Sequence, residues 1–560
     1  MRNRPLQLAT IVAALALGTV GCRPKPDDPV GQAGQLADAN RRTVAIENIQ
    51  RIYANALANA NGDRTKPEVR AVADAVAEPL TRTFIDNPAD SQNNARILEI
   101  MKDMRDPRTL PALQAALDYR RGVTESQAIA AADTIKMMEV PAGQRAGVIT
   151  ALMKAFDKTR ASQGQEGLIQ KGVVEALGSL RDRAAIPHLL RIATSENENQ
   201  LFLINRLALM QVGEIGDADA VPALVKALFM RSKDLRFGME DVAMGALVRI
   251  GRPSLDPLLA TLRGQNAEAN AEAARQIQLL STQNMGQGMT AQGLVGERAA
   301  MALGALGFAE ALDPLLGVAR GTDLGARANA AMALLQLNVN DAQRAQVREA
   351  VLAVIAAAPA DLQGLQIRAG LMGAATSSFD PGYLPIFLAQ ARTPDVPTDY
   401  PLSAAVDYAL LANKTEAAQL TTFVQSQDPA SEGGSRELFQ RAVQPMVDAA
   451  NACDMDLACW QGKLGDSDVA VARKAAAMIG RLGAGNAGAI TALEGQLNHR
   501  APEVRLTVLY AIDHIATAGA PAAVTKIDEL RTREDGQAIW RQVGPEATRI
   551  QNRLRSRSGS

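Results

Sequence analysis

Apolar side chains recur along most of this chain at intervals of three and four residues, the spacing that places them on one face of an α-helix. Val173, Leu177 and Leu180 form one such stripe, and a polar stretch at 181–183 (RDR) follows it. A second stripe begins near Pro187. Proline is tolerated in the first turn of a helix, where its missing N–H would be unpaired in any case, and a preceding Asp can cap the helix. The pattern therefore predicts two helices joined by a tight turn.

This helical hairpin is repeated along the chain. Pro187, Pro222 and Pro257 follow one another at intervals of 35 residues, and Pro314 comes 57 residues later. The extra length contains residues 281–293 (STQNMGQGMTAQG), which we interpret as an inserted loop. An earlier copy surrounds the proline at 111 and a weaker later one the proline at 385, and in the C-terminal part the pattern predicts helices at 471–482, 487–497 and 504–515.

A single hairpin cannot bury both of its faces, whereas stacked hairpins form a continuous core. The predicted fold class is therefore all-α, an α-solenoid (superhelix) of stacked antiparallel helix pairs. The repeated unit A-L-G-x-(I/L)-G-D-x-x-A-(V/I)-P-x-L resembles the HEAT-repeat family, in particular its short bilin-lyase-like members. The resemblance is most specific at 165–340 and looser at 66–160 and 466–532. It implies a curved surface suited to binding an extended partner.

The N-terminus has a different character. Arg2 and Arg4 precede an apolar run at 6–20 that is too short for a membrane span and has the layout of a secretory signal. The run ends in Thr-Val-Gly-Cys, which resembles the lipobox of bacterial lipoproteins, although Thr19 stands where that family usually has Leu. The resemblance implies that residues 1–22 are a signal peptide, that Cys22 is acylated, and that Arg23, in place of Asp, favours the outer membrane. The alternative is an ordinary cleaved signal in which Cys22 has no role.

Breaks in the helical pattern predict the organisation of the remainder. Prolines and glycines at 23–40 indicate a flexible tether. A HEAT-like solenoid is expected at 41–430, and a loop at 425–436 separates it from a C-terminal solenoid segment at 431–548. The basic, polar end at 549–560 is expected to be a disordered tail.

Charge and composition exclude some partners. The 560 residues include 59 Lys and Arg against 60 Asp and Glu, so the formal charge is −1 and no global field attracts nucleic acid. Aromatic residues make up only 3% of the chain, too few for a platform that stacks single-stranded bases. We expect no nucleic-acid partner.

If Cys22 carries lipid, Cys453 and Cys459 remain and can form a disulfide in an oxidising compartment. Residues six apart on a continuous helix are separated by about 9 Å, beyond the reach of a disulfide, so the pairing requires a turn between them. Asp454 and Asp456 are suitable helix caps for such a turn. The alternative is two free thiols in a metal or redox site, although C-x₅-C is not a zinc motif.

The sequence carries little recognisable chemistry. A G-x-G-x-x-G at 483–488 follows a predicted helix rather than a strand, so we interpret it as a turn. The three histidines, His188, His499 and His514, belong to no catalytic or metal motif, and we interpret each as structural. We therefore expect no catalytic residue, no metal and no cofactor, and predict that the protein is not an enzyme.

Two methionines, Met285 and Met289, lie in the inserted loop rather than in a helical stripe. An exposed methionine in a loop is an adaptable contact residue, and the alternative is a disordered insertion. The predicted function is a lipid-anchored, periplasm-facing HEAT-repeat scaffold in the bacterial envelope that binds a protein or peptide. The alternatives are an enzyme or chaperone-like relative of bilin lyases and a purely structural envelope component.

Overall fold

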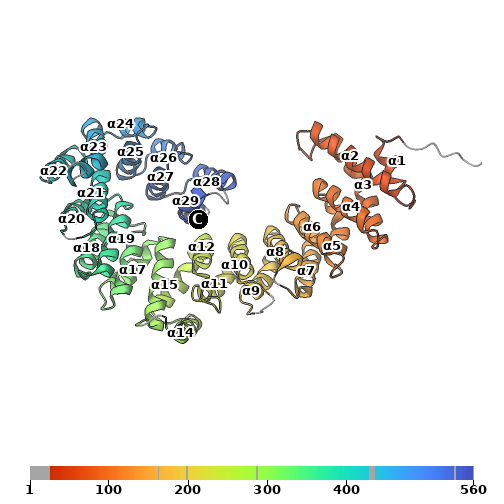
Figure 1. Cartoon of the computed structure of the whole chain (residues 1–560), viewed down its shortest axis with the longest axis horizontal. Coiled ribbons are helices and arrows are strands. Elements are labelled where there is room, and N and C mark those ends of the chain that lie inside the picture. The colour runs from red at the N-terminus through yellow and green to blue at the C-terminus, as the bar shows by residue number, and fades with distance from the viewer. Residues whose placement is uncertain are drawn as a thin grey trace, which may run out of the picture. The chain divides into compact units, whose positions relative to one another are not determined.

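A computed structural model describes residues 25–558 except 162, 197–199, 286–287, 395, 428–434 and 535–537. In these residues the fold is all-α, a HEAT-like α-solenoid of stacked antiparallel helix pairs, as the sequence predicts (Figure 1). The one β-type pairing in the described part is a bridge between Arg231 and Gly238. The chain divides into two compact units, the first ending at Ala176 and the second beginning at Leu177.

The first unit is built from helices that alternate between two layers. In one layer α2 packs against α4 and α4 against α6, and in the other α3 packs against α5 and α5 against α7. The helices are α1 (Pro29–Ala33), α2 (Arg42–Asn59), α3 (Pro67–Asp86), α4 (Ser91–Met104), α5 (Leu110–Leu117), α6 (Glu125–Lys136), α7 (Ala142–Lys158) and α8 (Gly164–Ser179), the last of which spans the boundary between the units.

The second unit continues the alternation. Its helices are α9 (Ile186–Ala193), α10 (Phe202–Ile215), α11 (Val221–Ala227), α12 (Glu240–Ile250), α13 (Leu255–Leu262), α14 (Ala267–Thr282), α15 (Ala291–Leu306), α16 (Leu312–Ala319), α17 (Leu324–Leu334), α18 (Asp341–Ala357), α19 (Leu362–Thr376), α20 (Leu384–Ala391), α21 (Asp399–Leu411), α22 (Lys414–Gln425), α23 (Ser435–Cys453), α24 (Leu457–Lys463), α25 (Val469–Leu482), α26 (Ala487–Glu494), α27 (Pro502–Ile515), α28 (Pro521–Glu534) and α29 (Ala538–Ser558).

A single 3₁₀ turn lies inside six of the described hairpins, and in several of them an Asp caps it. The carboxylates of Asp182 and Asp217 accept hydrogen bonds from backbone N–H groups two residues ahead, and each opens a single 3₁₀ turn before the proline-containing helix. Arg183 in one turn pairs with Asp217 and Asp219 in the next. Short 3₁₀ turns of this kind occur at Pro107–Thr109, Arg183–Ala185, Ala218–Ala220, Arg252–Ser254, Ala309–Ala311 and Pro381–Tyr383. Local capping therefore sets the hairpin geometry.

In the second unit the inner layer closes into a ring. Successive inner helices pack in the order α12, α15, α17, α19, α21, α25, α27 and α29, and α29 then packs against α12 (Figure 1). The Asn552 side-chain amide donates to the carbonyl of Gly245 at 3.3 Å, across 307 residues of chain. The helices approach closely: a Cβ on Gly304 of α15 would lie 2.6 Å from the Cα of Ala333 on α17. Small residues such as Gly304 thus allow neighbouring inner helices of the ring to pack closely together.

The predicted disordered tail at 549–560 is wrong for all of its described residues. α29 continues to Ser558, and Ile550 and Leu554 on one of its faces are fully buried against the ring. The sequence was misleading because the basic residues at 549, 553 and 557 suggest solvent exposure. At a spacing of four residues they share one helix face, while the apolar residues occupy another.

Three other boundaries differ from the expected ones. Within the predicted tether at 23–40, Pro29 begins α1, which packs against α2 and α3, and Leu36 is buried. Pro29 can begin α1 because the backbone N–H that proline lacks would have no partner in the first turn of a helix. The 57-residue interval contains a whole extra helix, α14, besides the loop before α15. The units divide at Ala176, whereas α22 and α23, on either side of residue 430, pack against each other.

Replacing Leu554 with Ala tests whether α29 holds the ring closed. We expect Leu554→Ala to lower the free energy of unfolding by about 2–5 kcal/mol, because it leaves a cavity in a fully buried contact. Gln542→Ala, on the exposed side of the same helix, should change it by less than about 0.5 kcal/mol. Urea unfolding of the full chain measures both variants. Equal stability of the two would mean that α29 contributes little to the ring.

Candidate functional site

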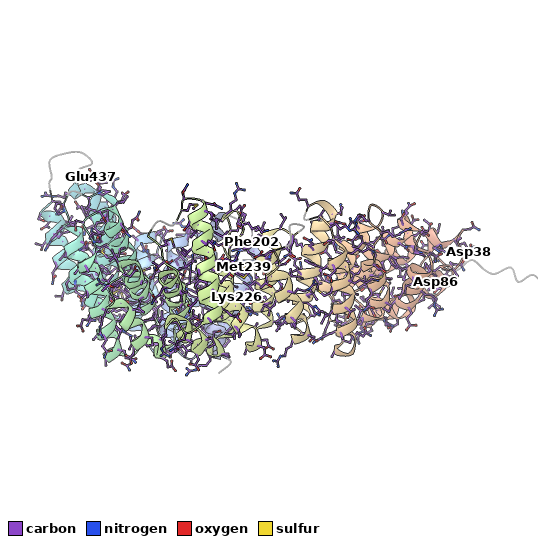
Figure 2. All side chains as sticks on the ribbon, turned by 90° about the horizontal axis from the view of Figure 1, so that it is seen from below. Asp38, Asp86, Phe202, Lys226, Met239 and Glu437 are labelled. Carbon is purple, nitrogen blue, oxygen red and sulfur yellow. A yellow bond between two sulfur atoms is a disulfide. The ribbon has the colours of Figure 1, made fainter. Side chains whose placement is uncertain are left out.

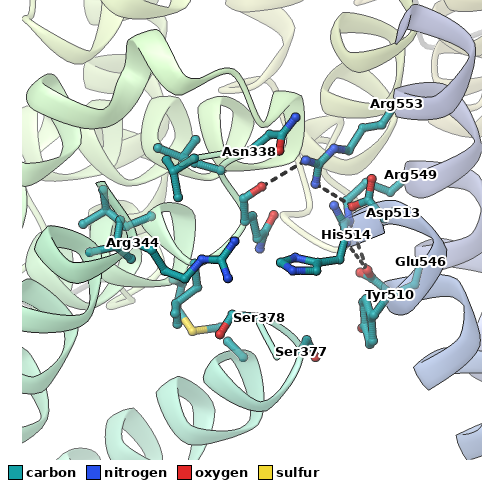
Figure 3. A pocket seen from close by; sticks show the side chains of 18 of the residues that line it. Asn338, Arg344, Ser377, Ser378, Tyr510, Asp513, His514, Glu546, Arg549 and Arg553 are labelled. Atoms are coloured by element: carbon teal, nitrogen blue, oxygen red, sulfur yellow. Dashed lines mark hydrogen bonds and ion pairs between the residues drawn. The ribbon is translucent and has the colours of Figure 1, made fainter. Parts of the chain in front are cut away.

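A cavity of about 400 Å³ lies inside the ring, and we call it the ring cavity (Figure 3). One wall is formed by the end of α17, the start of α18 and the end of α19. The opposite wall is formed by α27 and α29. The wall formed by α27 and α29 is rich in charged side chains, whereas the opposite wall carries most of the apolar lining together with Arg344.

The charged wall contains a buried ion-pair network. Asp513 of α27 lies 2.8 Å from a guanidinium nitrogen of Arg553 and 2.9 Å from one of Arg557. Burial alone would raise the pKa of Asp513, but these arginines outweigh it and hold that pKa below its usual value. Arg549 pairs with Glu546 at 2.7 Å. Each carboxylate of this wall is therefore engaged with at least one arginine.

His514 points into the same space as Arg344, which comes from the opposite wall (Figure 3). Burial, reinforced by the nearby Arg344 guanidinium, lowers the pKa of His514 to about 4. Its ring packs edge-on against Phe379 with the ring centroids 5.5 Å apart. The imidazole is therefore neutral near pH 7, and the positive charge of the cavity comes from arginine alone.

The apolar part of the lining lies opposite α29. It consists of the side chains of Met332, Leu335, Leu337, Val339, Val347 and Ala374. Met332 and Ala374 lie near the ends of α17 and α19, Val347 lies on α18, and the other three lie in the segment that joins α17 to α18. A cavity with one apolar side and a few convergent polar groups is the usual form of a small-molecule site.

A second feature lies around the start of α12. Residues 230–239 form a hairpin in which the Ser232 N–H donates to the Phe237 carbonyl, and Arg206 of α10 binds the carbonyl of Gly238. Figure 2 labels Phe202 and Met239 at this junction of α10 and α12. The side-chain amide of Gln283 reaches the Lys233 carbonyl at 3.5 Å, which places the loop after α14 beside the hairpin.

Each of these neighbouring elements carries exposed large apolar side chains. We call this set, Leu203, Met210, Phe237, Met285 and Met289, the methionine surface; its members are between 42% and 54% exposed. The two methionines that the sequence singled out therefore lie beside a hairpin that the sequence did not predict. Strand-like pairing over so few residues leaves no periodic signal, so only the neighbouring loop was recognisable.

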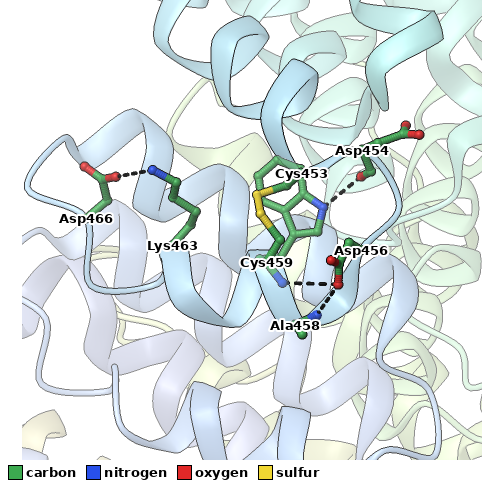
Figure 4. Close-up of a disulfide and its surroundings, with 8 residues drawn as sticks. Cys453, Asp454, Asp456, Ala458, Cys459, Lys463 and Asp466 are labelled. Carbon is green, nitrogen blue, oxygen red and sulfur yellow. Dashed lines mark hydrogen bonds and ion pairs between the residues drawn. A yellow bond between two sulfur atoms is a disulfide. The ribbon is translucent and has the colours of Figure 1, made fainter.

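Cys453 and Cys459 are joined by a disulfide, with their Cα atoms 5.4 Å apart (Figure 4). Cys453 ends α23, and Asp454 turns the chain with a left-handed backbone, φ 45°. The Asp456 carboxylate then caps α24 by accepting from the N–H groups of Ala458 at 2.9 Å and Cys459 at 3.3 Å. The indole N–H of the buried Trp460 donates to the Asp454 carbonyl at 2.9 Å.

The other residues that the sequence singled out are separate from these features. The G-x-G-x-x-G at 483–488 forms the turn between α25 and α26 and the first two residues of α26, so it is an inter-helix turn as predicted. His188 is partly exposed on α9, and His499 accepts a hydrogen bond from the Ala501 N–H. Cys22 and the predicted signal peptide lie outside the described residues. The sequence missed the cavity role of His514 and of the α29 arginines, although the four-residue spacing of the arginines was a readable signal.

Two kinds of feature are absent from the described residues. They contain no group of three or more His, Cys, Asp and Glu side chains arranged to hold a metal ion. None of the helices in the described part is both long enough and apolar enough to cross a bilayer.

No family model matches the sequence, and no curated protein is found as a relative. Similar solved structures include the karyopherin Kap121p bound to the SUMO protease Ulp1p, at 12% identity and TM-score 0.41, covering 93% of this chain and 73% of that chain. The Kap95:Nup1 complex has 12% identity and TM-score 0.43, covering 94% and 83%. Importin beta crystallised in ammonium sulfate has 12% identity and TM-score 0.41, covering 93% and 74%. At these TM-scores the likenesses carry no argument, and the fold rests on the structure itself.

Removing the disulfide tests its contribution to α24. The bridge closes a loop of only a few residues, so a Cys453→Ala/Cys459→Ala double variant should lose about 2 kcal/mol of stability. The measurement is urea unfolding of the full chain, compared with the unmodified protein under reducing conditions. If the double variant and the reduced protein are both as stable as the oxidised protein, the bridge has no stabilising role.

Proposed function

We propose that this protein is a membrane-anchored scaffold that binds a protein or peptide partner through the methionine surface. The observation that supports the proposal is that adjoining elements of one unit carry large apolar side chains, all more than two-fifths exposed. Contiguous exposed apolar patches are uncommon on soluble surfaces and mark sites of interaction. Methionine is suited to such a site because its unbranched side chain adapts to the shape of a partner.

The architecture is consistent with binding through distributed contacts. The surface draws residues from α10, the 230–239 hairpin and the loop after α14. Arg231 of the hairpin pairs with Glu240 at 3.0 Å, and Glu240 also pairs with Arg298 of α15 at 3.2 Å. These ion pairs fix the hairpin on the solenoid, so its exposed Phe237 is presented from a supported position.

The proposed location is the bacterial envelope, with lipid on Cys22 and the body facing the periplasm, more specifically at the outer membrane. The supporting observations are the short apolar run, the Thr-Val-Gly-Cys sequence and Arg23. A disulfide between Cys453 and Cys459 is compatible with an oxidising compartment. Several acyl chains on one cysteine would give stable anchoring, because each buried CH₂ contributes about 0.8 kcal/mol.

Substituting the loop methionines tests the binding role. Met285→Ser/Met289→Ser should reduce recovery of the partner from crosslinked native membranes about fivefold or more, because two apolar contacts are lost. Met455→Ser is the matched control, since Met455 is a 46% exposed methionine in the turn beside the disulfide. Recovery is quantified by mass spectrometry of affinity-purified full chain, and thermal unfolding should be unchanged in both variants. Unchanged recovery with the double variant would contradict the proposal.

Replacing the predicted lipidation residue tests the anchor. Cys22→Ser should shift the protein from the membrane fraction to the soluble fraction, and globomycin should accumulate the unprocessed form of the unmodified protein. The Cys453→Ala/Cys459→Ala variant serves as the control and should stay in the membrane fraction. Normal maturation under the inhibitor would show that Cys22 is not a lipidation site.

A further inference from the structure

The ring cavity has more positive than negative charge. Four arginines line it, Arg344, Arg549, Arg553 and Arg557, against the two carboxylates of Asp513 and Glu546. Both carboxylates pair with arginines of α29. His514 adds no charge near neutral pH because its pKa lies at about 4. Two positive charges therefore remain uncompensated by the lining residues.

Arg344 is the least engaged of the four. Within the described residues its one ion pair is a 3.9 Å contact with Asp341, whose side chain is almost fully exposed. Its guanidinium extends from the start of α18 toward His514 (Figure 3). A weak contact to a solvated carboxylate contributes little, so this guanidinium remains available to another anion.

The lining also holds buried donors that lack an acceptor. The Tyr383 hydroxyl, on a residue only 1% exposed, has no hydrogen-bond partner among the described residues, and neither has the Arg553 Nε. Burial raises the pKa of Tyr383 well above its usual value, so the hydroxyl keeps its proton and remains a donor. A buried donor without a partner costs about 1–3 kcal/mol, which an acceptor-rich ligand would offset.

The volume of the ring cavity and the side chains opposite α29 limit which class of ligand it can bind. A volume of about 400 Å³ accommodates a small organic molecule. The side chains of Leu335, Leu337 and Val347 provide an apolar surface opposite α29. Guanidinium groups bind the paired oxygens of carboxylates and phosphates in a bidentate manner. The ligand should therefore combine an oxyanion head with an apolar body.

We propose that the ring cavity binds a small organic anion, with its carboxylate or phosphate head at Arg344 and the charged wall and its apolar body against α17 and α18. The site is distinct from the methionine surface and does not depend on the proposed scaffold role. Binding spans the two walls of the ring, so occupancy should stabilise the closed form.

The test uses the purified full chain and three probes: 4-phenylbutyrate, phenyl phosphate and the uncharged 4-phenylbutyramide. At least one anionic probe should raise the midpoint of thermal unfolding, and the amide should not. A shift with only one anion would support the proposal and assign the head group to that class. Equal shifts with the amide and the anions, or no shift with either anion, would overturn it.

Variants of Arg344 locate the binding. Arg344→Gln should weaken calorimetric binding of the active probe about tenfold, the loss of one charge-assisted contact. Arg344→Lys should be intermediate, since it keeps the charge and loses the bidentate geometry. Arg320→Gln is the control, because Arg320 is exposed at the end of α16 and does not line the cavity. Because Arg344 is partly exposed, these variants should fold normally, which circular dichroism verifies. Unchanged binding by Arg344→Gln would overturn the proposal.

Discussion

Arginines of the last helix satisfy carbonyl groups at the C-terminal ends of inner helices, and these hydrogen bonds connect α29 to both walls of the ring cavity. Arg553 donates to the Gln336 carbonyl just beyond α17 at 3.0 Å, and Arg557 donates to the Asp513 carbonyl on α27 at 2.8 Å. The last carbonyls of a helix lack partners within it and carry the negative end of its dipole. Guanidinium groups are therefore well matched to this edge of the ring, and Gly307 leaves room for Arg553, whose guanidinium a Cβ there would overlap.

The sequence predicts the hairpins well because their determinants are local. An Asp cap, a proline and an apolar stripe all lie within a few turns of helix, so Asp182, Pro187 and Leu189 can be read together. Ring closure, unlike the hairpins, depends on contacts between residues far apart in the sequence. The Arg553–Gln336 contact joins residues 217 apart, and nothing near Arg553 in the sequence reveals its partner. Basic composition alone therefore made a packed helix look like a solvated tail.

The candidate sites show the same contrast between residues that are recognisable from the local sequence and residues that only folding brings together. Met285 and Met289 were identifiable because apolar residues interrupt a polar loop, whereas Phe237 was not, since its hairpin arises from packing against α10. The cavity combines residues from α17, α18, α19, α27 and α29. His514 was interpreted as structural from sequence because no metal or catalytic motif surrounds it. Its position beside Arg344 becomes visible only when the ring is formed.

Closure changes how a repeat array behaves. In an open solenoid each repeat contacts only its neighbours, so a local change has local consequences. Here α29 packs on α12 as well as on α27, so the stability of the first inner helix of the ring depends on the last. Closing so long a loop is opposed by chain entropy that grows only slowly with length, and burial of Ile550 and Leu554 on α29 acts against that cost. Since α27 and α29 form one wall of the ring cavity, a ligand that contacts both walls favours the state in which those walls face each other.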